Sequence, residues 1–336
     1  MIDEKYWEDY YSFWDGFVKA WYDQRKNGYQ KPQDEISKAY DNAVDNLVFD
    51  ELPNPYLGDP KNGVEAVIIN LNPGGSEQDA NKAGTDATQF YSNLKDGEHG
   101  KGWLMWKFVH EAGCSYRGFI GNDMNLLKDG KVVNWSQLNP ALRGHQPEVC
   151  GVKWWQGSNP QRVGGKRIPW IRRIYQTNVE PEQVFALELC PYHSVGFGLN
   201  NRDSIAKRTL SEFIVERVMK PAAMAVVESN LPFALAVGKG VADILDSVGA
   251  EFIKEWSHTT PIIGWPTNSR GELIMRTYRR YIVKAHNGQN ANIIVTWLKN
   301  NRGIPAPGKE FDGVERFIRN DCGIGNKKYH RETSND

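Results

Sequence analysis

The sequence predicts a mixed α/β fold, a three-layer αβα sandwich around a central four-stranded parallel sheet. The main observation is a set of short runs in which nearly every residue is apolar, as expected for strands that are covered on both faces. A stretch with helical character follows each run, and this alternation is typical of parallel sheets. With 336 residues, the chain is long enough to bury a substantial core.

Each predicted strand is short and runs into turn-forming residues. The four runs are VEAVIIN at 64–70, QVFALELC at 183–190, FALAVG at 233–238 and NIIVTW at 292–297. The helical stretches that follow them lie at 102–113, 202–219, 238–249 and 311–321. Because a helix follows each strand, crossover connections can place successive strands parallel to one another.

The segments outside this alternation define the predicted domain organisation. Aromatic residues spaced three and four apart predict one or two amphipathic helices in an N-terminal extension, residues 1–47. Residues 114–180 are rich in Gly, Pro, Asn and Trp, so we interpret them as a large insertion. We therefore expect a single domain over 1–322 and a flexible tail over 323–336.

Composition and charge argue against several classes of protein. Lys and Arg total 41, as do Asp and Glu, so the net charge is +0 and any DNA-binding surface must be a local patch. The four cysteines lie far apart without a C-x-x-C pair, so we expect no metal, no iron–sulfur cluster and no other cofactor. The N-terminus lacks a signal-peptide pattern and no stretch is apolar enough to span a membrane, so we expect a cytoplasmic protein.

The first predicted strand runs into an unusual loop, Asn70-Leu71-Asn72-Pro73-Gly74-Gly75. In an open parallel sheet, ligands bind beyond the carboxyl ends of the strands, which is where this loop lies. Proline restricts the loop, while the glycines let backbone N–H groups approach a ligand closely. The loop matches neither the Walker A nor the G-x-G-x-x-G pattern. An ordinary Asn-Pro-Gly turn is the alternative interpretation.

The order of these elements resembles the uracil-DNA glycosylase superfamily over most of residues 49–320. Two of its branches, mismatch-directed and single-strand-selective, carry G-I-N-P-G where this chain reads N-L-N-P-G from position 70. The resemblance implies that Asn72 holds the water that attacks the deoxyribose C1′, and that Phe90 or Tyr91 stacks on the extruded base. The turn with Gly238 and Lys239 is similar to the turn after the third strand of these enzymes.

The chain departs from the family pattern at three places. Asn70 replaces the first glycine, and Glu188 stands in the second strand, where these enzymes carry the asparagine that reads uracil. After the fourth strand, residues 296–302 read T-W-L-K-N-N-R instead of an H-P-S motif. The carboxylate, the missing asparagine and the large aromatic insertion favour a base that is larger than uracil or similar to cytosine.

Glu188 is the second predicted catalytic residue, beside Asn72. Its carboxylate can activate water, stabilise an oxocarbenium-like transition state or accept a hydrogen bond from a cytosine amino group. The alternative is a structural ion pair with an arginine of the insertion, because an unpaired glutamate is rarely buried.

Other residues are assigned to the site by their position or by the resemblance. Those predicted to bind the base are Asn70, Pro73, Gly74, Phe90, Tyr91, Tyr192 and His193. Those predicted to bind DNA are Arg162, Lys166, Arg167, Gly238, Lys239, Lys299, Asn300 and Arg302. A second basic group comprises Arg276, Arg279, Arg280 and Lys284. Basic patches beside aromatic residues suit a DNA backbone, although for any single residue a solvated surface position is the alternative.

The sequence thus predicts a monofunctional DNA glycosylase that hydrolyses the N-glycosidic bond of a flipped-out modified base and leaves an abasic site. The chain looks most like the bacterial anti-phage glycosylases that remove glucosylated hydroxymethylcytosine, so double-stranded, modified phage DNA is the expected partner. No lysine lies in an evident Schiff-base pocket, and we expect attack by water without a lyase step. No obligate protein partner is indicated.

Three different functions stay open at this point. The chain could be a catalytically silent module that flips and senses a modified base. It could be a glycosylase for uracil or another deaminated base. It could also be a nucleoside hydrolase, which would need no basic insertion and would act on free nucleosides.

Overall fold

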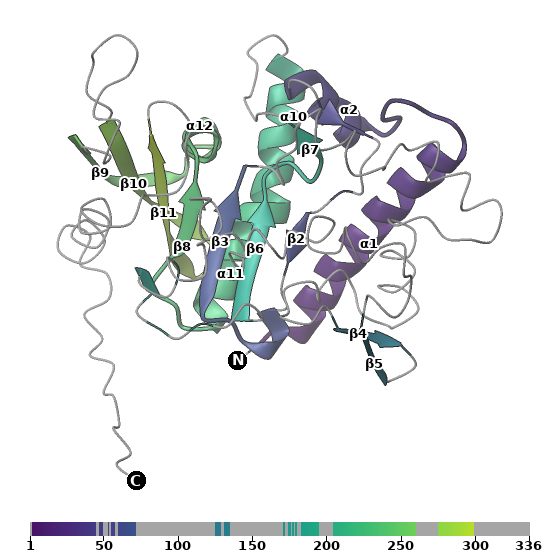
Figure 1. Cartoon of the computed structure of the whole chain (residues 1–336). Coiled ribbons are helices and arrows are strands. Elements are labelled where there is room, and N and C mark those ends of the chain that lie inside the picture. Colours follow the sequence, from purple (N-terminus) through teal and green to yellow (C-terminus); the bar gives the residue numbers. More distant parts are fainter. Residues whose placement is uncertain are drawn as a thin grey trace, which may run out of the picture.

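The protein forms a mixed α/β structure in which helices pack against a large sheet (Figure 1). The computed structural model describes residues 2–44, 47–49, 53, 55–57, 60–71, 125–128, 131–134, 171, 174–175, 177, 179, 183–194, 204–259 and 275–298. No helix within these ranges has the length and apolar character that crossing a membrane requires.

Within the described residues, the main sheet has seven strands in the order β2-β6-β3-β8-β11-β10-β9. Their bounds are β2 Tyr56–Leu57, β6 Val184–Glu188, β3 Ala66–Asn70, β8 Ala234–Val237, β11 Asn290–Leu298, β10 Met275–Lys284 and β9 Glu251–Thr259. The strands β6, β3, β8 and β11 are parallel, and these confirm the four strands that the sequence predicts. The prediction of a four-stranded sheet is incomplete, because β2, β10 and β9 extend the sheet with antiparallel pairs.

The strands β10 and β9 escaped prediction because neither is apolar throughout. In β10, Arg276 and Tyr278 are buried whereas Thr277 and Arg279 are half-buried, so the strand alternates between two environments. Because Arg276 is charged but buried, the hydrophobicity of the sequence does not show the alternation of buried and half-buried positions. In β9, the edge strand of the sheet, even Phe252 is exposed. Antiparallel strands with one solvated face do not need the continuous apolar runs of the parallel centre.

In the part of the chain that the structure describes, two small antiparallel sheets accompany the main sheet. One pairs β1 (Leu47–Val48) with β7 (His193–Ser194). The other pairs β4 (Asn125–Lys128) with β5 (Lys131–Asn134), and it lies within the sequence interpreted as an insertion.

The helices confirm most of the helical predictions that fall on described residues. Their bounds are α1 Glu4–Lys26, α2 Glu35–Ala43, η1 Pro60–Asn62, α10 Ser204–Ile214, the π-helical turn η5 Val215–Met219, α11 Lys220–Glu228 and α12 Lys239–Ser247. The predicted N-terminal helices are α1 and α2, and the predicted helix at 202–219 continues through η5 into α11. The helices predicted at 102–113 and 311–321, and the tail, lie outside the described residues.

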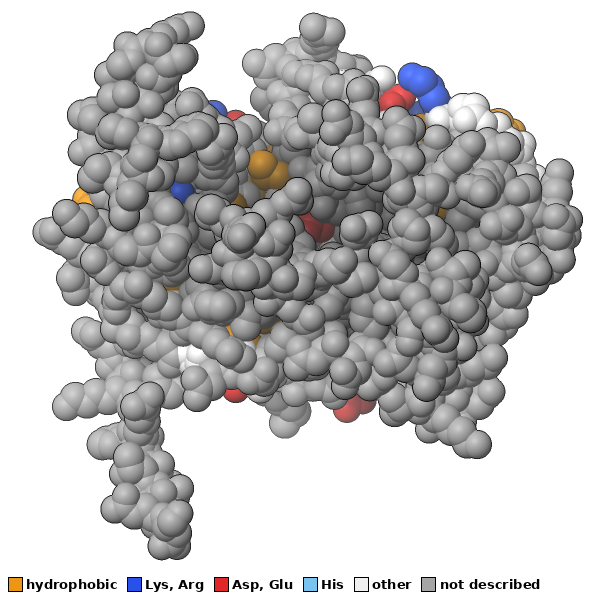
Figure 2. Space-filling model, in the orientation of Figure 1, with side chains coloured by type: hydrophobic (Ala, Val, Ile, Leu, Met, Phe, Trp, Pro, Cys, Tyr) orange, Lys and Arg blue, Asp and Glu red, His pale blue; other side chains and the backbone are white. Residues whose placement is uncertain are grey.

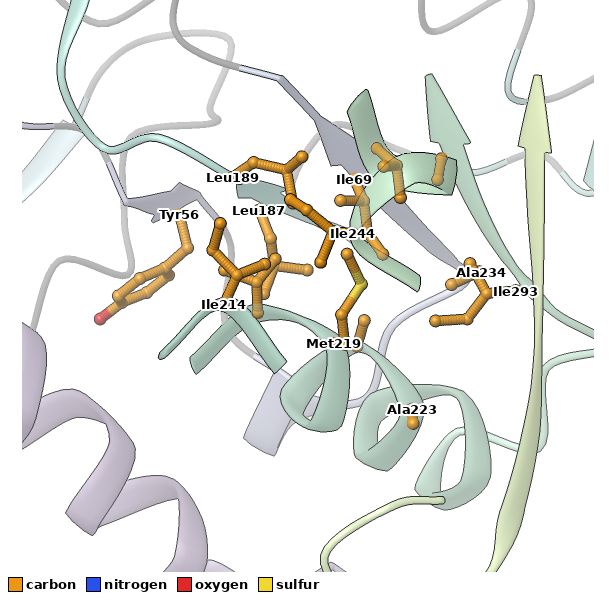
Figure 3. Packing of buried hydrophobic residues seen from close by; sticks show 14 of the residues in the cluster. Tyr56, Ile69, Leu187, Leu189, Ile214, Met219, Ala223, Ala234, Ile244 and Ile293 are labelled. Carbon is orange, nitrogen blue, oxygen red and sulfur yellow. The ribbon is translucent and has the colours of Figure 1, made fainter. Parts of the chain in front are cut away.

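Both faces of the parallel strands carry apolar side chains. Alternate residues of a strand point to opposite faces, so Ile69 and Ile68 belong to different clusters. Ile69 packs with Ile214 and Met219 of the helices (Figure 3). Ile68 belongs to the cluster on the opposite face, which includes Tyr175. Burial on both faces explains why these strands are apolar at nearly every position.

The helix α1 is part of the main core. Its aromatic stripe, including Trp7 and Trp14, is buried in the same cluster as Phe185 of β6. Glu228, at the end of α11, accepts hydrogen bonds from the backbone N–H of Asp3 at 2.5 Å and from Nε1 of Trp7 at 2.6 Å. The N-terminal helices therefore contribute to the core of the sheet domain instead of standing beside it.

Candidate functional site

Buried polar side chains gather at the carboxyl edge of the main sheet, the side on which the parallel strands end. Within the described residues, the buried polar and charged side chains are Ser37, Asn70, Glu188, Ser211, Arg276 and Thr296. Four of these six lie on strands of the main sheet, near the carboxyl ends of the parallel strands or beside them on β10. This is the edge at which open parallel sheets bind their ligands.

Asn70 and Glu188 form a hydrogen-bonded pair at the ends of two adjacent parallel strands. They are the last residues of β3 and β6 and lie opposite one another in the register. Nδ2 of Asn70 donates to Oε1 of Glu188 at 2.9 Å, and the two residues are only 4% and 8% exposed. By strand alternation they share the face of Ile68, away from α10 and α11.

The backbone holds this pair in place beyond the ends of the two strands. The N–H of Leu189 donates to the carbonyl of Asn70 at 3.0 Å, and that of Cys190 donates to the carbonyl of Leu71 at 2.9 Å. On the other side, the N–H of Glu188 donates to the carbonyl of Pro55 at 3.0 Å. These bonds hold the main chain of both residues in place, and the hydrogen bond between the side chains joins the amide to the carboxylate.

The polarity of the hydrogen bond fixes what the pair can recognise. An ionised carboxylate only accepts hydrogen bonds, so the amide group of Asn70 must present its N–H to Glu188. The other oxygens of the two side chains, Oδ1 of Asn70 and Oε2 of Glu188, are acceptors by their chemistry. A group that faces these oxygens must supply N–H or O–H donors, as an exocyclic amino group or an attacking water does.

Cys190 follows the pair in the sequence but has different chemistry. Its side chain belongs to the core on the helical face. Burial raises the pKa of the thiol far above its ordinary value, and the nearby Glu188 carboxylate raises it further. The thiol is therefore protonated at neutral pH and unsuited to act as a nucleophile.

Most residues predicted to complete the site lie outside the described residues. These are Asn72, Pro73, Gly74, Phe90, Tyr91, Arg162, Lys166, Arg167, Lys299, Asn300 and Arg302. Their roles stay predictions. The described part of the first motif ends at Leu71, the residue before Asn72. The carbonyl of Leu71 accepts a hydrogen bond from the N–H of Cys190, which follows β6.

The structure separates Tyr192 from Asn70 and Glu188. The Tyr192 side chain is buried in the main core, and its hydroxyl lies 2.6 Å from Oγ of Ser37 in α2. The assignment of Tyr192 to the base pocket is therefore corrected to a role in packing. Tyr192 lies between β6 and β7, outside any regular strand, so strand alternation does not set the direction of its side chain. His193 lies in β7, where it pairs with Val48 of β1.

Gly238 and Lys239 begin α12 at the end of β8. Gly238 has φ +116°, a conformation that favours glycine, and a Cβ at this position would lie 2.5 Å from Cδ1 of Leu71. The exposed Lys239 pairs with Asp243 of the same helix at 2.6 Å. Gly238 thus allows the close approach of the segments that follow β8 and β3.

Replacing Gly238 with alanine is expected to destabilise the protein by about 1–3 kcal/mol, because alanine is strained at this φ and its methyl group would displace Leu71. Urea unfolding measures the change. Gly249→Ala is the matched control, since Gly249 also has a positive φ of +68° but a Cβ added there would have no neighbouring atom within 4 Å. An equal loss of stability in both variants would show that the contact with Leu71 contributes nothing.

The second basic group does not form one patch. Arg279 lies on the helical face, where it donates to Asp246 at 2.7 Å and also pairs with Glu255. Arg276 lies on the opposite face and is wholly buried, with Nη1 donating to Oγ1 of Thr296 at 3.2 Å. The prediction of a shared DNA-binding surface overlooked that residues 276 and 279 of one strand point to opposite sides.

Few charged side chains of the described residues are visible on the face drawn in Figure 2. Figure 2 shows isolated basic and acidic side chains of the described residues, without a continuous basic patch among them. Within the same part of the chain, no group of three or more His, Cys, Asp and Glu residues is arranged to hold a metal ion. The chemistry that the described residues offer is that of a buried amide, carboxylate, hydroxyl and guanidinium.

Comparisons with known proteins give no match for this chain. No protein-family model matches the sequence, no curated protein matches it, and no solved structure matches its fold. A function must therefore be argued from the site itself.

Proposed function

We propose that the protein is a monofunctional DNA glycosylase that removes a modified, cytosine-like base and leaves an abasic site. The observation that carries the proposal is the buried Asn70–Glu188 pair at the carboxyl edge of adjacent parallel strands. A carboxylate at this edge can activate the attacking water for hydrolysis of an N-glycosidic bond. The oxygens of the carboxylate and the amide can accept hydrogen bonds from the amino group of a base. The expected three-layer sandwich would enclose this edge between helical layers.

The proposed reaction starts with a nucleotide turned out of the duplex. Glu188 and Asn72 position a water molecule below C1′ of the deoxyribose. The bond between C1′ and the base nitrogen breaks, its electron pair leaves with the base, and positive charge develops on the sugar. The water oxygen then bonds to C1′, while its proton passes to the Glu188 carboxylate. Glu188 also stabilises the developing charge, and no covalent enzyme intermediate forms.

The polarity of the pair supports an amino-bearing base as the substrate. The cytosine edge offers an N4 amino group as a donor, whereas uracil offers the O4 acceptor at the same place. Since the Asn70 amide N–H is directed at Glu188, the pair matches the amino group better than the carbonyl. Among modified cytosines, glucosylated hydroxymethylcytosine in phage DNA is the substrate that the family resemblance suggests, in line with a role in anti-phage defence.

Base release from defined DNA tests the proposal. Purified protein is incubated with duplexes that contain glucosylated hydroxymethylcytosine, cytosine or uracil, and alkali-labile strand breaks are scored. We expect breaks only with the modified cytosine. Binding of the modified duplex without any release would instead identify a sensor of modified bases. Release from uracil duplexes would identify a uracil glycosylase, and hydrolysis of free nucleosides alone would identify a nucleoside hydrolase.

A further inference from the structure

The helix α2 is hydrogen-bonded to the segment that directly follows Glu188. Tyr40, a wholly buried residue of α2, donates its phenol hydroxyl to the carbonyl of Leu189 at 2.5 Å. Ser37, three positions earlier in the helix, has its Oγ 2.6 Å from the hydroxyl of Tyr192. An N-terminal helix thus holds the chain just beyond the end of β6, 149 positions later in the sequence.

The packing of α2 fixes the direction of the Tyr40 hydroxyl. The buried residues Ser37, Tyr40 and Ala43 follow one another at helical spacing, so this face of the helix turns to the core. The ring of Tyr40 lies edge-on to the ring of Tyr192 at a centroid distance of 6.2 Å and to that of Phe213 in α10 at 6.1 Å. Because two rings and the helix itself confine the phenol, its hydroxyl is directed at one carbonyl.

The peptide group that Tyr40 binds joins the two strands of the candidate site. The carbonyl of this peptide, that of Leu189, accepts from Tyr40, and its N–H donates to the carbonyl of Leu71 at 2.9 Å. Leu189 directly follows Glu188, and Leu71 directly precedes Asn72. One peptide group therefore connects Tyr40 to the main chain beside both residues of the proposed reaction.

Loss of the phenol donor would disturb this peptide group. Leu189 is wholly buried, and a buried carbonyl that loses its donor carries a cost in free energy. The peptide group can recover a donor only by rotating, which moves the neighbouring Glu188 and weakens the hydrogen bond to Leu71. Reactions between positioned groups are sensitive to such shifts, since a displacement of about 1 Å can slow them by about 100-fold.

We propose that Tyr40 is a positioning residue for base release. Its hydroxyl holds the peptide group after Leu189, so that Glu188 and Asn72 keep the geometry that the reaction requires. The inference rests on the proposed function for the reaction itself. It gives the N-terminal helices a part in catalysis as well as in the core. Because Tyr40 is wholly buried, it acts through the main chain.

Tyr40→Phe tests this role, because it removes the hydroxyl and keeps the ring. Single-turnover base release at saturating protein should slow by at least about 10-fold, while the protein concentration that gives half the maximal rate stays within about twofold. Amide hydrogen exchange at Leu189 and Cys190 should become about 3- to 10-fold faster, the effect of losing one hydrogen bond. Equal rates of release in the variant and the unaltered protein would overturn the inference.

Two matched variants separate positioning from a general loss of stability. Tyr10→Phe removes the hydroxyl of another buried tyrosine, one that bonds to no main-chain group among the described residues, and it should keep the rate. Ser37→Ala removes the other link of α2 to this segment, which ends on the side chain of Tyr192. It should lower the melting temperature, as Tyr40→Phe does, yet keep the rate. An equal loss of rate in Ser37→Ala and Tyr40→Phe would overturn the inference, because stability alone would then explain both.

If Tyr40→Phe does not fold, 4-aminophenylalanine at position 40 decides the question. Its amino group is a weaker donor at the same place, so base release should slow by about threefold and amide exchange should become faster to a similar extent. Unchanged rates of release and exchange would overturn the positioning role. Absence of base release by the unaltered protein is a distinct outcome, which overturns the proposed function together with the role that rests on it.

Discussion

Glu188→Gln is expected to reduce base release by at least about 100-fold, because an amide cannot take the proton of the attacking water. Glutamine keeps the size of the side chain and can still bond to Asn70, so the fold and DNA binding should change little. The measurement is the single-turnover rate of base release from the modified duplex, with binding to the uncleaved duplex measured in parallel.

Glu65→Gln is the matched control for this variant. Glu65 directly precedes β3, at the amino ends of the same two strands, and its carboxylate accepts from Nε2 of Gln183 at 3.0 Å. A carboxylate at this end of the sheet has no role in the proposed reaction, and the variant should retain the rate. Equal rates for Glu188→Gln and the unaltered protein would remove Glu188 from the mechanism.

Asn70→Asp gives an independent readout at the same pair. Two carboxylates within hydrogen-bond distance cannot both ionise easily, so the pKa of one of them rises. A reaction that requires ionised Glu188 should then shift its acidic limb to higher pH. A purely structural role for Asn70 would lower stability without moving the pH profile.

Trp7→Ala is expected to cost about 3–5 kcal/mol in the free energy of unfolding, the usual range for removing a buried tryptophan. Trp7 is wholly buried, and its ring packs edge-on against Phe185 of β6 at a centroid distance of 5.7 Å. The substitution also leaves Glu228 without the indole donor at the end of α11. Urea unfolding followed by circular dichroism measures the loss.

Two further variants separate packing from hydrogen bonding at this position. Trp7→Phe keeps an aromatic ring but removes the N–H, and we expect it to cost about 1–3 kcal/mol. Tyr29→Ala removes an aromatic side chain that is 47% exposed, and a change within about 0.5 kcal/mol is expected. A small effect of Trp7→Ala would mean that α1 is dispensable for the sheet core.

Local apolar patterns predict the centre of the sheet better than its edges. The four parallel strands were predicted correctly because burial on both faces demands continuous apolar runs, as at Ile68 and Ile69. The helix α12 and the N-terminal helices were predicted correctly from the spacing of their apolar residues. The prediction failed for β9 and β10, where exposed positions and a buried arginine conceal the alternation of a half-buried hairpin.

The sequence placed Asn70 and Glu188 correctly at the carboxyl ends of two parallel strands, while their roles stay predictions. Asn70 ends the first predicted strand and Glu188 lies near the carboxyl end of the second, and parallel strands bring these ends to one edge. Tyr192 was assigned incorrectly, because the direction of a side chain beyond the end of a strand depends on what packs around it, here α2 and Ser37. Thr296 was overlooked, although it is a polar residue that interrupts the apolar part of the fourth strand.

The sequence by itself determined the parallel centre of the sheet, the edge where polar side chains collect and the neutral balance of charge. These properties follow from local patterns of apolar residues and from composition. Only the tertiary structure decided that Asn70 bonds to Glu188, that Arg276 and Arg279 face opposite sides, and that α1 joins the core. The reason is that strand order and register bring together residues more than a hundred positions apart, such as Asn70 and Glu188, and no local pattern encodes which of them meet.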